Sequence, residues 1–476
     1  MHAGPCGYGY LVELGNSRTL PVAVIGGGVT GLASAFALAR SGCPVRLLEA
    51  SSRAGGVIQS DRSAEGWQTE SGPHTLLLND PEVRKLIDDL DLTDRIIPAS
   101  PEARHRYILR AGKPVAAPAS PPGLIRSPLF SFRTKMRVFA ELFRRPRARS
   151  TDVSLAALVA EHFGQEFVDY ALQPFVSGVY AGDAARLSAR HAFPRVWQDD
   201  QERGSLVRGM MRTAKERRRR GEPRPQLISF AHGLQAIPDA LALGLPDGCL
   251  QLRTQIDTVR PEGDLWRASG LRDGQPWSGS FSRVILALPA RALEKITVGN
   301  SGDRPFDSLS ELEHSPITVV SLGYRRQDIA HPLDGFGLLM PACENRQILG
   351  VIFVSSLFPD RAPAGHVALT VMIGGNRQRD LCALPAGQIQ ALVESELHQA
   401  LGASGPPVFF KQRTWPSAIP QYNLGFERFK STIVSTENRF QGLFVAGTVH
   451  DGISVPLALL SGLRTAGKCL GSPASS

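Results

Sequence analysis

Hydrophobic residues near the start of the chain occur in runs and spacings that predict alternating strands and helices. The run VAVIGG, residues 22–27, is short, apolar and partly β-branched, as expected of a buried strand. The stretch LASAFALAR, residues 32–40, spaces its apolar residues as a helix that packs on a sheet. PVRLLEA, residues 44–50, supplies a second strand. The order strand, helix, strand predicts an α/β fold with a parallel sheet.

Three glycines separate the first strand from the helix, in the spacing Gly26-x-Gly28-x-x-Gly31. The first permits a tight turn, the second lets the backbone approach a pyrophosphate, and the third lets the helix pack closely on the strand. Glu49 ends the second strand 23 positions after Gly26 (49 − 26), where a dinucleotide-binding fold places the acid that accepts hydrogen bonds from ribose hydroxyls. These features together predict dinucleotide binding.

An arginine and two glycines follow this acid in the stretch EASSRAGG, residues 49–56. This tail resembles the extended flavin signature of the superfamily of amine oxidases, phytoene desaturases and protoporphyrinogen oxidases. The resemblance implies FAD as the cofactor, with Arg53 at the pyrophosphate and backbone at the glycine pair lying against the flavin. The residues implied for FAD binding are Gly26, Gly27, Gly28, Val29, Thr30, Gly31, Glu49, Ala50, Arg53, Gly55, Gly56, Val57, Gly72, Pro73, His74, Thr75, Val259, Trp415, Gly447, Ile453, Ser454 and Val455.

Seven blocks carry a more specific resemblance, to the protoporphyrinogen oxidases, over about residues 21–468. FGQEFVDYALQPFVSGVYAGDAARLSAR, residues 163–190, matches the family's Pro-Phe-x-x-Gly-x-Tyr-Ala-Gly-Asp core followed by Leu-Ser. The other blocks are HRYILRAGKPVAAP (105–118), SFAHGLQAIPDAL (229–241), GFGLLMP (335–341), LGVIFVSSLFPDRAP (349–363), IPQYNLGF (419–426) and GLFVAGTVHDGISVPLALLSG (442–462). The chain departs from the common family pattern at Gly447-Thr448, at Leu457-Ala458 and at Ile352.

The resemblance implies that protoporphyrinogen IX is oxidised to protoporphyrin IX in three two-electron steps within haem synthesis. Oxygen or another acceptor would reoxidise the flavin, and no catalytic side chain is implied because the cofactor carries the chemistry. Arg106 occupies the family's propionate-binding position, and a guanidinium pairs with a carboxylate through two charge-assisted hydrogen bonds. The residues implied for substrate binding are Arg106, Phe336, Gly337, Leu339, Ile352 and Met372.

Length, charge and cysteine content limit the number of domains, the kind of partner and the compartment that can be expected. The 476 residues exceed the usual size of one hydrophobic core, so two or three domains are expected. A net charge of +9 favours an acidic partner such as a phospholipid surface or nucleic acid. Six dispersed cysteines without a C-x-x-C pair indicate a reducing, cytosolic compartment. Residues 1–20 lack the pattern of a secretion signal, and we assign them no function.

Two strongly basic runs help to decide between nucleic acid and anionic lipid as the partner. They are FRRPRARS, residues 143–150, and RTAKERRRRGEPRP, residues 212–225. Neither is interleaved with aromatic residues for base stacking, so nucleic acid is not expected. Each run is either a solvated helix end or a site of attraction to anionic head groups. Residues 120–150 mix Leu, Ile and Phe with Arg and Lys, as an interfacial element does. We therefore expect a cytoplasmic protein held peripherally on the cytoplasmic membrane, and leave a homodimer open.

The fold class expected is α/β, with a Rossmann-like FAD-binding domain interleaved with an α+β substrate-binding domain and a mostly helical membrane-associating domain. The expected bounds are 21–100, 226–300 and 411–470 for the FAD-binding domain, 101–115 and 301–410 for the substrate-binding domain, and 116–225 for the helical module. Three alternatives stay open, because a fold does not determine a substrate. They are coproporphyrinogen III as the substrate, another flavin oxidase of the amine-oxidase type, and a flavin-binding carrier that passes porphyrin on without turnover.

Overall fold

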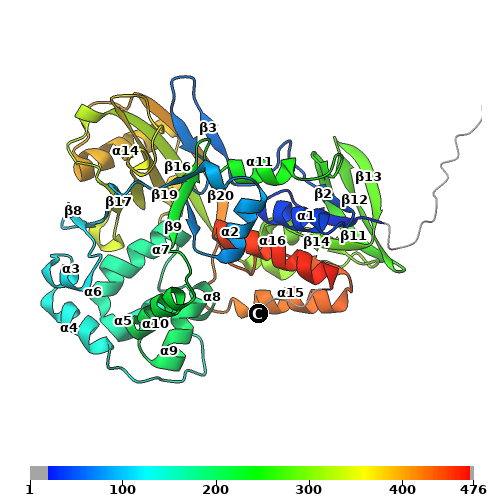
Figure 1. Cartoon of the computed structure of the whole chain (residues 1–476), viewed down its shortest axis with the longest axis horizontal. Coiled ribbons are helices and arrows are strands. Elements are labelled where there is room, and N and C mark those ends of the chain that lie inside the picture. The colour runs from blue at the N-terminus through cyan, green and yellow to red at the C-terminus, as the bar shows by residue number, and fades with distance from the viewer. Residues whose placement is uncertain (1–19, 472–476) are drawn as a thin grey trace, which may run out of the picture.

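The computed structural model describes residues 20–471, so the N-terminal stretch to which no function was assigned lies almost entirely outside the described residues. A five-stranded parallel sheet forms the centre and right of Figure 1. In spatial order its strands are β10 (Leu250–Gln251), β2 (Val45–Leu48), β1 (Val22–Ile25), β14 (Arg283–Leu286) and β21 (Leu443–Val445). Helix α1 (Val29–Arg40) joins β1 to β2, which confirms the strand–helix–strand prediction.

The two faces of this sheet are covered differently, because alternate residues of β1 point to opposite sides. Val22 and Val24 pack among helices α1, α11 (Ala236–Leu243) and α16 (Val455–Leu470). Ala23 and Ile25 pack toward an antiparallel sheet made of β11 (Thr254–Glu262), β12 (Leu265–Arg272) and β13 (Gln275–Phe281), which β15 (Thr297–Val298) extends. The parallel sheet is thus covered on both faces, so its strands are almost continuous apolar runs.

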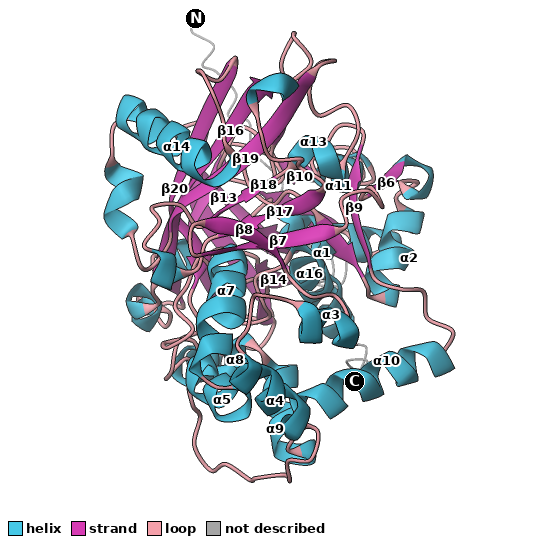
Figure 2. Ribbon diagram, turned by 90° about the vertical axis from the view of Figure 1, so that its left-hand side faces the viewer, coloured by secondary structure: helices cyan, strands magenta, loops and turns pink. Residues whose placement is uncertain are grey.

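A seven-stranded mixed sheet forms the upper left of Figure 1 and faces the viewer in Figure 2. In spatial order its strands are β20 (Phe409–Pro420), β16 (His314–Arg325), β19 (His366–Gly374), β18 (Gly350–Ile352), β17 (Gly335–Leu339), β7 (His105–Arg110) and β8 (Lys113–Ala116). Helix α14 (Ala386–Leu401) covers one face, where Val320, Val371 and Leu397 belong to one buried cluster. The other face is turned toward the hairpin of β3 (Ser60–Arg62) and β4 (Gln68–Glu70), since Trp67 of that hairpin stacks on Phe409.

Between β8 and β9 (Gln226–Phe230) the chain is helical and forms the lower part of Figure 2. The main helices are α3 (Pro121–Arg126), α4 (Phe132–Glu141), α5 (Leu155–Phe163), α7 (Gln173–Tyr180), α8 (Ala189–Ala192), α9 (Pro194–Arg203) and α10 (Leu206–Arg219). Strand β9 then pairs with β5 (Leu76–Leu78) and β6 (Ile96–Pro98), which returns the chain to segments that precede the helices. Among residues 20–471, every helix is too short or too polar to cross a bilayer.

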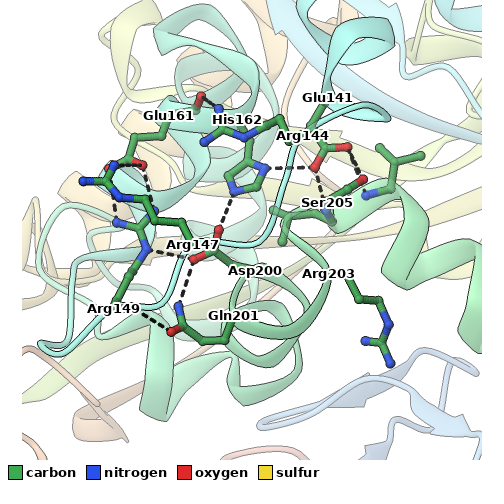
Figure 3. A network of polar contacts seen from close by, with 12 residues as sticks. Glu141, Arg144, Arg147, Arg149, Glu161, His162, Asp200, Gln201, Arg203 and Ser205 are labelled. Atoms are coloured by element: carbon green, nitrogen blue, oxygen red, sulfur yellow. Dashed lines mark hydrogen bonds and ion pairs between the residues drawn. The ribbon is translucent and has the colours of Figure 1, made fainter.

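A buried imidazole holds four of these helices together (Figure 3). His162 on α5 contacts Glu141 of α4 through Nδ1 and Asp200 of α9 through Nε2, each at 2.9 Å. Glu141 also accepts a hydrogen bond from the Ser205 hydroxyl at the start of α10, and Asp200 accepts one from Nε of Arg149. Since both ring nitrogens face carboxylate oxygens, both bonds form only when the imidazole carries two protons.

The neighbours of these two carboxylates keep them ionised. Burial alone would raise the pKa of Glu141, but hydrogen bonds from His162 and Ser205 lower it below its ordinary value. The pKa of Asp200 is lowered in the same way, by Arg149 and His162 against the effect of burial. The stabilisation from these groups is therefore present above the ordinary carboxyl pKa and is lost as the pH falls through their lowered values.

We expect His162→Ala to lower the free energy of unfolding at pH 7 by about 3 kcal/mol, because it removes from two buried carboxylates the imidazole that joins them. Urea unfolding followed by circular dichroism measures this. His232→Ala is the matched control, since His232 is exposed, and its effect should stay within about 0.5 kcal/mol. Equal stability of the two variants would show that the network does not hold the helices together.

Candidate active site

The glycine turn after β1 has the geometry that its spacing predicts. Gly26 has a φ of +108°, and a Cβ placed there would lie 2.4 Å from the carbonyl oxygen of Ala287. A Cβ on Gly31 would lie 1.9 Å from the carbonyl oxygen of Gly26, so only glycine lets α1 approach the turn this closely. A Cβ on Gly28, in contrast, would meet no atom of residues 20–471 within 4 Å. The turn is closed toward the protein and open at the position predicted to face pyrophosphate.

Glu49 ties the end of β2 to this turn. Its Oε2 accepts a hydrogen bond from the N–H of Gly27 at 2.6 Å, and its Oε1 accepts one from the N–H of Ser51 at 2.8 Å. Helix α1 begins at Val29 without a side-chain cap, so the N–H groups of its first turn are available to a phosphate. The carboxylate can accept hydrogen bonds from ribose hydroxyls, and the turn beside it can receive the pyrophosphate of a dinucleotide.

The loop after β2 lies directly on the glycine turn. The N–H of Gly55 donates to the carbonyl of Gly27 at 2.8 Å, and Gly28 and Gly55 form a parallel bridge. A Cβ on Gly56, whose φ is +59°, would lie 3.2 Å from the Cα of Gly28. The turn at residues 26–31 and the pair Gly55-Gly56 are therefore parts of one surface, called the glycine surface below. A larger residue at Gly56 would crowd its open position.

Arg53 shapes this loop through hydrogen bonds to its backbone. Its guanidinium donates to the carbonyls of Ala54, Gly56 and Ile58. This internal role is one that the sequence did not suggest, and the pyrophosphate contact expected of Arg53 stays a prediction. On either side of Arg53, Ala50 and Val57 are exposed, so both can face a bound group.

Distant segments that were predicted for FAD binding meet this surface. A Cβ on Gly72 would lie 2.2 Å from the carbonyl oxygen of Val57, so the segment Gly72–Thr75 runs beside the loop. A Cβ on Gly447 would lie 3.6 Å from Oγ1 of Thr30. Nε1 of Trp415 donates to the carbonyl of the residue before Gly72 at 2.6 Å. Segments from four parts of the chain are thus joined at one place.

The remaining predicted flavin contacts occupy two different environments. Ile453, Ser454 and Val455 surround the N-terminus of α16, where Ser454 is the N-cap and accepts a hydrogen bond from the N–H of Leu457 at 3.4 Å. The positive end of the helix dipole there favours electron-rich or anionic groups. Val259 is fully buried on β11, in the core between the two sheets. Its contact with FAD stays a prediction.

His74 is a buried side chain whose polar atoms are unsatisfied. Neither ring nitrogen has a hydrogen-bond partner among residues 20–471, although the Gly72 carbonyl lies near the ring. Burial lowers the pKa of His74 to about 4. Burial likewise raises the pKa of Glu70, at the end of β4, to about 7. An orphaned imidazole at the edge of the glycine surface is a position that a bound cofactor would complete.

One buried charge near His74 and Glu70 was not predicted from the sequence. Arg361 is almost fully buried and donates to the Ser229 hydroxyl at 2.9 Å and to the Phe230 carbonyl at 2.8 Å. It lies in the block LGVIFVSSLFPDRAP, and an arginine that closes an otherwise apolar run was the signal available. By these bonds the segment between α13 (Val354–Leu357) and β19 is fastened to β9.

The residues predicted for substrate binding line one face of the seven-stranded sheet. Gly337 pairs with Arg106 on β7 and with Ile352 on β18. Met372 on β19 pairs with Gly350, which shares a face with Ile352 because it lies two residues before it. The residues that share this face are Arg106, Gly337, Leu339, Ile352 and Met372. The opposite face packs under α14, so this is the face that remains for a ligand.

Phe336 reaches the same region through a β-bulge. The register between β17 and β7 shifts between Gly335 and Gly337, so Phe336 is the extra residue. The Arg106 guanidinium lies 5.7 Å from the centre of its ring. Among residues 20–471, Arg106 has no carboxylate within ion-pair distance, and its charge is free for an anionic ligand. Bulges commonly re-aim a side chain beside a binding site.

A bound flavin therefore fits the residues that are present. The glycine surface offers an open turn, a carboxylate, two helix N-termini and an unsatisfied imidazole, and the sheet offers an apolar wall with the guanidinium of Arg106 beside it. Together they define an FAD-dependent oxidoreductase. The model of the family described as flavin containing amine oxidoreductase matches residues 29–470, and the chain belongs to this family.

Individual relatives show which members of this family the chain resembles. The mitochondrial protoporphyrinogen oxidase of Nicotiana tabacum is 32% identical over 481 residues, covering 95% of each chain. The protoporphyrinogen oxidase of Homo sapiens is 30% identical, covering 96% of this chain and 99% of the human protein. Among solved structures, an Exiguobacterium protein with a provisional protoporphyrinogen oxidase name aligns with a TM-score of 0.79 at 21% identity, over 94% of this chain and 98% of its own. Putrescine oxidase aligns with a TM-score of 0.67 at 18% identity, over 95% and 99%. Both structures support the shared fold.

Two glycine variants separate the role in folding from the role in cofactor binding. Gly31→Ala should lower the free energy of unfolding by about 1–3 kcal/mol, because its Cβ meets backbone. Gly28→Ala should leave stability nearly unchanged, because its φ is −69° and its Cβ meets open space, but it should weaken FAD binding. Urea unfolding and titration of the apoprotein with FAD measure the two effects. Normal FAD affinity in Gly28→Ala would place the pyrophosphate elsewhere.

Proposed function

We propose that this FAD-dependent oxidoreductase converts protoporphyrinogen IX to protoporphyrin IX in haem and porphyrin biosynthesis. The observation that carries the proposal is the ligand-facing side of the seven-stranded sheet, where a free guanidinium adjoins an apolar wall next to the glycine surface. Full-length similarity to proteins named protoporphyrinogen oxidase supports the choice of substrate. Six electrons leave the substrate in three two-electron steps, and oxygen is the proposed final acceptor.

The bound FAD supplies hydride acceptance, and the side chains supply binding and orientation. Arg106 pairs with a propionate carboxylate through two charge-assisted hydrogen bonds. Phe336, Leu339, Ile352 and Met372 contact the macrocycle and exclude water from it. Helix α7 closes the wall from the helical side, since a Cβ on Gly178 would lie 3.1 Å from Cδ2 of Leu339. No side chain is assigned a catalytic role.

Coproporphyrinogen III is the alternative substrate, because it differs from protoporphyrinogen IX only at peripheral groups. Porphyrin fluorescence from the purified, FAD-loaded protein tests both substrates in turn. Faster formation of protoporphyrin IX supports the proposal. A preference for coproporphyrinogen III would instead place the enzyme one step earlier in porphyrin biosynthesis. Product formation no faster than autoxidation with either substrate would overturn the proposal and favour the carrier or an amine-oxidase-type activity.

Arg106→Ala should raise the KM for the porphyrinogen about tenfold or more, because it removes the charge that pairs with a propionate. FAD content should stay normal, since Arg106 lies on the substrate face of the sheet. Arg272→Ala, at an exposed arginine of β12, is the matched control. An unchanged KM in Arg106→Ala would remove this residue from substrate recognition.

We further propose that the three expected domains have the roles assigned from the sequence, with the helical module of residues 116–225 as the membrane-associating part. Four large apolar side chains lie on one side of α4 and its extension at the helical spacings of four, three and four residues. They are Phe132, Met136, Phe139 and Phe143, all exposed, with Phe132 at 78% and Phe143 at 73%. Arg133, Lys135, Arg137 and Arg144 lie among them. Such a surface suits peripheral attachment to anionic lipid.

A triple variant tests this attachment. Phe132→Ser, Phe139→Ser and Phe143→Ser together should reduce cosedimentation with phosphatidylglycerol vesicles at least tenfold, because about 2 kcal/mol or more of apolar burial is lost. Leu243→Ser is the control, since Leu243 is 88% exposed on α11, outside the helical module. Equal vesicle binding by the triple variant and the control would contradict the proposal, as would equal recovery without detergent at low and high salt.

A further inference from the structure

The loop between β21 and α16 carries several of the predicted flavin contacts but has little regular structure. It comprises residues 447–454, begins at Gly447 with a φ of +113°, and includes Gly452 with a φ of +109°. Two glycines in the left-handed region make such a loop conformationally permissive. Its shape must therefore be set by hydrogen bonds from other parts of the protein.

One buried side chain bridges this loop. The hydroxyl of Tyr422 donates to the carbonyl of Thr448 at 2.6 Å and accepts from the N–H of Gly452 at 2.9 Å. The residue is only 2% exposed, and burial raises the pKa of its phenol, so the hydroxyl keeps the proton that it donates. A single oxygen thereby joins two backbone groups that lie four residues apart along the loop.

A second contact fixes the beginning of the loop to α16. The N–H of Gly447 donates to the hydroxyl of Ser461 at 2.8 Å, and that hydroxyl donates to Asp451. These bonds hold the loop against the helix that follows it. The bridge from Tyr422 comes from the opposite side, from the segment that follows β20.

The position of Tyr422 is itself set by the helical module. The N–H of Ser188 donates to the Tyr422 carbonyl at 2.8 Å. The side chain of the preceding residue, Gln421, donates to the carbonyl of Tyr180 at the end of α7, at 2.9 Å. The Tyr422 ring stacks on Phe426, with 4.1 Å between the ring centres. A chain of contacts thus runs from α7 and α8 through Tyr422 to the loop.

We propose that Tyr422 is a positioning residue for the flavin. It holds residues 447–454 in the shape that receives the cofactor, and it makes that shape depend on the placement of the helical module. Without its hydroxyl, the buried N–H of Gly452 and the carbonyl of the half-buried Thr448 would lose this partner. The proposal rests on the proposed flavin site at Gly447 and residues 453–455.

Tyr422→Phe removes the bridging oxygen and keeps the ring. Titration of the apoprotein with FAD should show a dissociation constant about tenfold higher than that of the unchanged protein. Tyr324→Phe is the matched control, because Tyr324 is also almost fully buried but lies on β16, in the core cluster under α14 that contains no residue of the loop. The control should alter FAD affinity less than twofold, even if both variants lower the unfolding temperature equally.

Equal FAD affinity in Tyr422→Phe and Tyr324→Phe would overturn the role of Tyr422 while leaving the flavin site intact. Failure of the unchanged protein to bind FAD would instead overturn the flavin site on which the proposal rests. Hydrogen exchange on the unchanged protein gives a second measurement that needs no variant. The Gly452 amide should be protected even without FAD, and exchange at the rate of a free amide would contradict a preformed loop.

Discussion

The close approach of helix α1 to the turn that precedes it is the contact on which the site depends. With no side chain at Gly31, the helix rests on the Gly26 carbonyl, and its free N–H groups point at the open position of Gly28. The same helix receives α16, since the Ser34 hydroxyl donates to the Gly462 carbonyl at 3.0 Å. A shift of α1 by the width of a methyl group would therefore disturb the turn, the loop on it and the second helix N-terminus together.

The seven-stranded sheet contributes through the difference between its two faces. One face is a closed core under α14, and alternation along the strands places every second residue on the other face. Arg106 is one of the basic residues on that face, and its charge, which has no carboxylate partner among residues 20–471, can orient an anionic ligand there. Arg361, in the segment that leads into β19, holds that segment to β9 through the Ser229 hydroxyl and the Phe230 carbonyl.

Local patterns along the chain were enough to predict β1, α1, β2 and the glycine turn, because each depends on neighbours in sequence. The pairing of β7 with β17 brings together residues such as His105 and Asp334, 229 positions apart, and the bulge at Phe336 arises only from that pairing. Neither leaves a periodic signal. The two carboxylates around His162 were also invisible, because they come from different helices. The role of Arg53 in its own loop depends on a backbone shape that residue types do not reveal.

The most direct measurement is anaerobic mixing of the purified, FAD-loaded protein with protoporphyrinogen IX while the absorbance of the flavin is followed. An enzyme that passes electrons from the porphyrinogen to its own cofactor must lose the oxidised flavin spectrum in the absence of oxygen, and recover it when oxygen is admitted. We predict this bleaching, together with porphyrin fluorescence. A flavin that stays oxidised while the porphyrinogen is bound would contradict the account and identify the protein as a carrier.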